Sequence, residues 1–146
     1  MSALFELSPR MTAEQAQMLS PLQLAYVGDS VHALLVRTGL VRKNWRVKDM
    51  HRAANQAVSA VSQARELQRV LPLLTEEEAA IARRGRNAHS HHSAPKSAST
   101  GEYAEATGLE ALLGYLYLTG RTDRILALTP YLYAEEKEPC PKPSCG

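Results

Sequence analysis

Two acidic residues stand alone in the most apolar parts of this sequence. Asp29 is the only formally charged residue between positions 25 and 36, and Glu110 is the only one between 106 and 120. A buried carboxylate is costly unless it is protonated, paired or bound to a metal. For one such acid, a helix cap, a pair with an arginine or a place at a helix edge is the better explanation.

A glycine lies close to each acid, Gly28 directly before Asp29 and Gly114 one turn after Glu110. Glycine inside a helix costs about 1 kcal/mol relative to alanine, so it indicates a close approach of two backbones. Two helices that cross there would bring the acids together, and like charges in contact need a cation between them. Composition and spacing alone leave a metal site and the structural explanations open. Mg²⁺ would suit an oxygen-only pair, and such sites commonly act on phosphate esters.

A basic segment without any acid lies between Ile81 and Gly101. Arginines and hydroxyls suit phosphate oxygens and read little base sequence. The segment has no aromatic platform for stacking single-stranded bases, whereas duplex RNA is read through its backbone and 2′-hydroxyls. A solvated surface loop is the alternative interpretation. Its basic residues and histidines are Arg83, Arg84, Arg86, His89, His91, His92 and Lys96.

The elements that must position these residues all have helical patterns, which predicts an all-α, compact helical bundle. We expect one domain over residues 1–133 and a flexible tail over 134–146, in which Cys140 and Cys145 are reduced thiols rather than metal ligands. The fourth helix is expected to end in the basic run 83–87. The expected helices are Thr12–Met18, Pro21–Thr38 ended by Gly39, Val47–Leu71, one beginning after Thr75, Thr100–Thr119 ended by Gly120, and Asp123–Tyr133.

The composition is that of a globular domain. The 146 residues are 45% hydrophobic and 22% charged, which is ordinary for a folded protein. No apolar run approaches the roughly 20 residues that span a bilayer, and the first residues lack a signal-peptide layout. We therefore expect a soluble, cytoplasmic protein without a membrane partner.

Several of these motifs resemble one enzyme family. Residues 24–31, LAYVGDSV, resemble the signature helix of ribonuclease III catalytic domains, and residues 110–118, EALLGYLYL, resemble the later helix that supplies a metal-binding glutamate. The closer resemblance is to the Mini-ribonuclease III subfamily, which lacks an appended double-stranded-RNA-binding domain. The stretches similar to that subfamily are RGRNA at 84–88, VSA at 58–60, QA at 63–64, PK at 95–96 and ATGL at 106–109.

This resemblance implies an all-helical homodimer with the ribonuclease III endonuclease-domain fold. It implies Mg²⁺-dependent cleavage of double-stranded RNA, with Mn²⁺ as a substitute, that leaves a 5′-phosphate and a 3′-hydroxyl. It further implies maturation of the precursor of large-subunit (23S) ribosomal RNA. Asp29 and Glu110 would be the catalytic, metal-binding residues. The residues expected to bind RNA are Arg84, Arg86, Asn87 and Lys96, with His51 and Arg52 adding backbone contacts.

Two positions depart from the full-length enzymes of the family. Ala25 and Thr107 stand where those enzymes have a glutamate and an aspartate, so we expect weaker metal binding, with more ligand positions left to water and RNA phosphate. One alternative is a non-catalytic protein that binds double-stranded RNA or the ribosome on the same scaffold. Another is a helical nucleotide pyrophosphohydrolase, but its Glu-x-x-Glu pairs are missing, and helix capping explains the acids at 76–78 better.

Overall fold

The computed structural model describes residues 9–88 and 99–132, and within these ranges every regular element is helical, as the sequence predicts. Lys96, the three histidines at 89, 91 and 92, and the two cysteines lie outside the described residues. The helices are α1 (Ala13–Gln17), α2 (Pro21–Val41), α3 (Val47–Ala57), α4 (Ala60–Val70), the short 3₁₀ helix η2 (Leu71–Leu73), α5 (Glu76–Ala88), α6 (Thr100–Leu118) and α7 (Thr122–Leu132).

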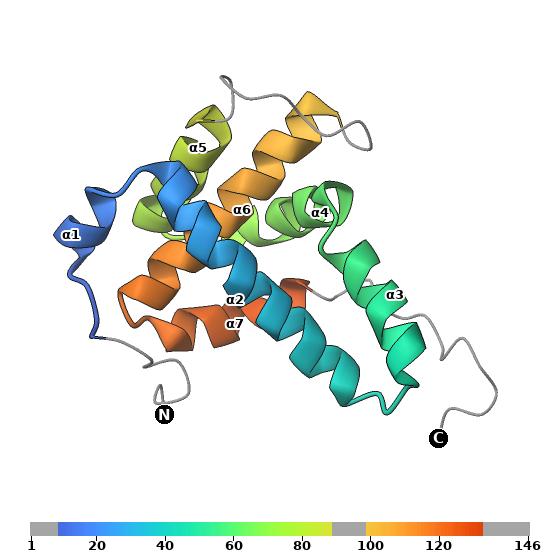
Figure 1. Cartoon of the computed structure of the whole chain (residues 1–146). Coiled ribbons are helices and arrows are strands. Elements are labelled where there is room, and N and C mark those ends of the chain that lie inside the picture. Colours follow the sequence, from blue (N-terminus) through green and yellow to red (C-terminus); the bar gives the residue numbers. More distant parts are fainter. Residues whose placement is uncertain (1–8, 89–98, 133–146) are drawn as a thin grey trace.

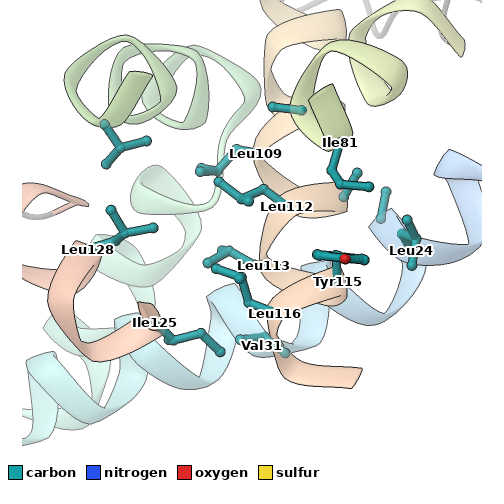
Figure 2. Close-up of a cluster of buried hydrophobic side chains, with 14 of the residues drawn as sticks. Leu24, Val31, Ile81, Leu109, Leu112, Leu113, Tyr115, Leu116, Ile125 and Leu128 are labelled. Carbon is teal, nitrogen blue, oxygen red and sulfur yellow. The ribbon is translucent and has the colours of Figure 1, made fainter. Parts of the chain in front are cut away.

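The helix α6 lies at the centre of the bundle. It packs against α2, α4 and α5, and α2 crosses over it (Figure 1). Its sequence is apolar on all sides, which is typical of a helix that is enclosed rather than laid on a surface. Figure 2 shows its leucines meeting side chains of the surrounding helices. The fully buried side chains of α6 include Leu109, Leu112, Leu113, Tyr115 and Leu116.

The predicted capping boxes are present at the starts of α2 and α5. The Ser20 hydroxyl accepts a hydrogen bond from the backbone N–H of Gln23 at 3.1 Å, and the Gln23 side chain accepts one from the backbone N–H of Ser20 at 2.8 Å. Thr75 and Glu78 form the same reciprocal pair. These bonds satisfy N–H groups that have no partner within the helix, so they fix where each helix begins.

The single helix expected from Val47 to Leu71 is wrong, because the chain forms two helices there. The first, α3, ends at Ala57, and Ser59 caps α4 by accepting a hydrogen bond from the backbone N–H of Ser62 at 3.2 Å. The apolar spacing continues through this break because both helices turn an apolar face inward. The separation gives α3 its own small core against the far end of α2, where it packs on Val36 and Leu40.

Two expected helix ends, at Gly39 and in the basic run 83–87, are wrong. Gly39 lies inside α2, which continues to Val41, and Gly85 lies inside α5, which continues to Ala88. Gly85 faces α6: a Cβ added to it would lie 2.9 Å from the Cα of Gly108. Its small size serves helix packing, so the basic residues at 83–87 lie on a helix and not in a loop.

The end of α6 agrees with the expected stop at Gly120. This glycine has a φ of +72°, a conformation that L side chains rarely adopt. The backbone N–H of Gly120 donates to the carbonyl of Tyr117, and that of Arg121 donates to Leu116, so the last turn is closed and α7 can begin at Thr122. None of the described helices is long and apolar enough to span a membrane.

Candidate active site

Two glycines bring α2 and α6 into backbone contact. A Cβ added to Gly28 would overlap the backbone carbonyl of Glu110, and one added to Gly114 would overlap that of Leu24. Each added Cβ would also lie within 3.0 Å of the other glycine's backbone nitrogen. No larger residue fits at either position, so this close crossing, expected from the sequence, brings the turn after Gly28 beside Glu110.

The crossing brings the carboxyl groups of Asp29 and Glu110 into hydrogen-bond contact with each other. Two carboxyl groups can share a hydrogen bond only when one of them is protonated. Glu110 is partly buried, while Asp29 is exposed on α2. Of the alternatives that the sequence left open, Asp29 takes the place at a helix edge, at the surface side of the crossing.

The surroundings of Glu110 strongly disfavour its charged form. Burial first, then the hydrogen bond and the negative charge of Asp29, raise the pKa of Glu110 from 4.5 to about 8, while a hydrogen bond from Gln63 acts in the opposite direction. A carboxyl group with so high a pKa near neutral pH is typical of functional sites. A divalent cation between the two acids would neutralise both and displace the shared proton.

The site also includes Gln63, which was not among the expected site residues. Gln63 lies on α4 with 2% of its surface exposed, and its amide nitrogen donates to Oε2 of Glu110 at 3.4 Å. The sequence motif at residues 63–64 includes Gln63 but gives it no role. The partner of Gln63 is 47 residues away in sequence, so only the packing of α4 on α6 identifies it.

The donor set of this site fits a hard cation. Carboxylate and amide oxygens are what Mg²⁺ prefers, and Mg²⁺ commonly binds through one or two carboxylates while retaining several waters. Among the residues that the structure describes, no cluster of three or more histidines, cysteines or acids could hold a metal.

Neither of the two departing positions adds a ligand. Ala25 is a buried residue of α2. Thr107 is also buried, and its hydroxyl donates to the backbone carbonyl of Tyr103 within α6 at 3.0 Å. Asp29 and Glu110 are thus the acids that this crossing offers a cation, and the remaining ligand positions would go to water or substrate.

The expected RNA-binding residues on α5 differ in their surroundings. Asn87 is exposed. Arg84 donates to the backbone carbonyl of Leu19 at 3.2 Å, and Arg86 forms an ion pair with Glu105 at 3.1 Å, so both guanidinium groups are half-buried and held by their own chain. Arg83, which the sequence analysis did not select, is exposed on the same helix and adds a cation to this surface.

The other two expected contacts lie on α3. His51 and Arg52 are both exposed there. On the same helix, the buried Asp49 pairs with the N-cap residue Arg46 at 3.3 Å. Positive groups are therefore presented by two separate helices, α3 and α5.

Comparisons with known proteins agree with these observations. Residues 22–121 match the family described as the ribonuclease III domain. The chain is 50% identical over 108 residues to the Mini-ribonuclease 3 of Symbiobacterium thermophilum, covering 73% of this chain and 82% of that protein. It is 44% identical over 126 residues to the Mini-ribonuclease 3 of a Thermoanaerobacter species, covering 86% and 88%. A crystal structure of protein FN1578 from Fusobacterium nucleatum superposes with a TM-score of 0.73 at 27% identity, covering 80% and 93%.

Proposed function

The chain belongs to the ribonuclease III family and is an endoribonuclease of double-stranded RNA, and we propose that it cleaves with Mg²⁺ held by Asp29 and Glu110. The observation that supports this proposal most is the hydrogen-bonded pair of these two carboxyl groups, with the pKa of Glu110 raised to about 8. Such a pair is unfavourable unless it holds a proton or a cation. Mn²⁺ has the same ligand preference and would substitute.

The two acids have different tasks in this proposal. Glu110 is partly buried and would bind the cation from the interior side. Asp29 is exposed and would bind it where a phosphate of the substrate can reach it. When bound, the cation supplies a Lewis acid that activates water and offsets the charge that builds up on the phosphate oxygens. Cleavage would leave a 5′-phosphate and a 3′-hydroxyl.

Basic and polar side chains on α3 and α5 would bind the RNA backbone. Asn87, His51 and Arg52 are exposed and available for phosphate or 2′-hydroxyl contacts, and Arg84 and Arg86 would add positive charge from their half-buried positions. Lys96 lies outside the described residues, and we propose it as a further RNA contact on its charge alone. Contacts of this kind select a duplex by shape and give an affinity that falls steeply with salt.

A homodimer would place two such sites on one duplex. Of the two helices that form the site, α6 is enclosed, whereas α2 exposes large apolar side chains, with Tyr26 82% and Leu34 51% accessible. These two residues are eight positions apart, about two helical turns, and so lie near one face. An apolar helical face of this kind is suited to a second copy of the chain.

We further propose that the natural substrate is precursor 23S ribosomal RNA in the cytoplasm.

The direct test is incubation of the purified protein with long duplex RNA, in Mg²⁺ and in chelator, beside Asp29→Asn. We expect endonucleolytic fragments only with Mg²⁺ and only from the unchanged protein, because an amide in place of this carboxylate lacks the charge that holds the cation. The matched control is Asp123→Asn, which changes another exposed aspartate at the start of α7. This variant should cleave normally.

Other outcomes would redirect the proposal. Cleavage by Asp29→Asn at the normal rate would exclude Asp29 as a metal ligand. RNA that stays intact with every cation, yet shifts on a native gel, would support the non-catalytic RNA-binding alternative. A cell that lacks the protein should accumulate unprocessed 23S ribosomal RNA, and normal processing there would exclude that substrate.

A further inference from the structure

Two polar side chains of α4 contact α2 and α6, the helices that carry the acid pair. Gln63 and Glu66 lie three residues apart on α4, so their side chains lie on the same face. Gln63 contacts Glu110 of α6, and Glu66 contacts His32 of α2. His32 is itself three residues after Asp29, so both contacts lie within about one helical turn of the site.

The contact between His32 and Glu66 is enclosed in the protein. Nε2 of His32 lies 2.8 Å from Oε1 of Glu66, and the two residues are 0% and 4% exposed. Burying such a pair is expensive unless its geometry is good, and removing one partner alone is strongly destabilising. The pair links α4 to α2, in addition to the packing of α4 on α6, one turn from the point at which Gln63 enters the site.

The metal site needs residues that orient its ligands, because it has few protein ligands. With two carboxylates as its protein ligands, the site depends on the direction of each carboxylate plane. Glu110 has a flexible side chain, and its Oε2 is the atom that the buried amide of Gln63 approaches. Groups that hydrogen-bond to metal ligands orient them, and their loss typically costs about 10- to 100-fold in metal affinity or activity.

We infer that Gln63 is a positioning residue of this site: its amide orients the Glu110 carboxylate toward the cation, and the His32–Glu66 pair holds α4 where this contact is possible. The inference rests on the proposed metal site. It assigns Gln63 no contact with the substrate. Its consequence is a defect in cation binding and not in the chemical step.

The test measures Mn²⁺ binding to the full chain without RNA, by electron paramagnetic resonance of the free ion. Gln63→Met keeps the length and flexibility of the side chain and removes the amide, so the dissociation constant should rise about tenfold. Gln68→Met is the matched control, since Gln68 lies on the same helix but binds the distant Glu105 at the surface. This control should bind Mn²⁺ as the unchanged protein does.

Cleavage kinetics provide a second readout. In Gln63→Met the cation concentration for half-maximal cleavage should rise by a similar factor, while kcat at saturating cation stays near that of the unchanged protein. A general loss of structure would lower kcat at every cation concentration. A kcat that does not recover at saturating cation would overturn the positioning role.

Asp29→Asn separates this inference from the proposed function. If Asp29→Asn loses Mn²⁺ while Gln63→Met binds it normally, the metal site stands and the inference is overturned. If Asp29→Asn binds Mn²⁺ normally, the proposed site is wrong and the inference falls with it. Should Gln63→Met fail to fold, Gln63→Asn keeps a buried amide but shortens its reach by one methylene. The same loss of affinity is then expected, and normal Mn²⁺ binding would overturn the inference.

Discussion

At the scale of single residues, the main feature is a carboxyl group held in its protonated form. Burial and the neighbouring Asp29 raise the pKa of Glu110 to about 8. In the unfolded chain this group titrates near its ordinary value of 4.5, so between this value and about 8 the folded state binds an additional proton. Folding stability must therefore decrease as the pH rises through this window.

The resulting prediction concerns the free energy of unfolding in the presence of chelator. It should fall by up to about a few kcal/mol between about pH 5 and about pH 8, and Glu110→Gln should reduce this fall because an amide does not titrate. Urea unfolding at several pH values measures both slopes. Glu76→Gln, which changes an exposed glutamate, controls for the loss of one charge. Equal slopes in the unchanged protein and in Glu110→Gln would contradict the prediction.

The two acids of the site are predictable from the sequence, whereas the residues that contact them are not. Asp29 and Glu110 stand out because a lone charge in an apolar helix demands an explanation. Gln63 and the His32–Glu66 contact do not stand out, because each joins helices that are distant in sequence. The exposure of Asp29 was also not predictable, since it depends on which edge of α2 the crossing leaves open.

Among the helices, a glycine can end a helix or allow two helices to pack closely, and the local sequence does not distinguish these two roles. Gly28 and Gly114 allow backbone contact between α2 and α6, and Gly85 allows close packing of α5 on α6. Gly39 has no atom within 4 Å of an added Cβ and is simply part of α2. The correct helix starts followed from capping residues. The ends expected at Gly39 and in the run 83–87 were wrong, because tertiary packing decides the role of a glycine in a helix.

A pair of alanine substitutions in α2 tests this difference. Gly28→Ala must push α6 away from α2, so we expect a loss of about 3 kcal/mol or more in the free energy of unfolding, with loss of cleavage. Gly39→Ala meets open space inside a helix and should gain up to about 1 kcal/mol. Urea unfolding of both variants provides the comparison. A Gly28→Ala protein as stable as Gly39→Ala would refute the close crossing.

At the scale of the whole molecule, the enclosed α6 and the exposed face of α2 have opposite roles. The apolar pattern of α6 made it a predictable core helix. The face of α2 that includes Tyr26 and Leu34 remains open in the single chain. Periodicity did not identify this face as exposed, because an apolar stripe that meets the core and one that meets a second copy have the same spacing.

We therefore predict that Tyr26→Glu is a folded monomer under conditions in which the unchanged protein is a dimer, because a carboxylate would be buried at the interface without a partner. Light scattering after gel filtration measures the mass, and circular dichroism checks the helices. Tyr131→Glu, which changes another exposed tyrosine, on α7, should stay dimeric. A monomeric unchanged protein, or a dimeric Tyr26→Glu, would argue against this interface.

The small core between α2 and α3 has an optical consequence. The only tryptophan of the chain, Trp45, packs against this core, and the ammonium group of Lys43 lies 5.0 Å from the centre of its ring. Indole emission depends on the polarity and charge around the ring. The intrinsic fluorescence of this protein therefore reports on the contact between α2 and α3, and α3 is the helix that presents His51 and Arg52. It does not report on the large core around α6.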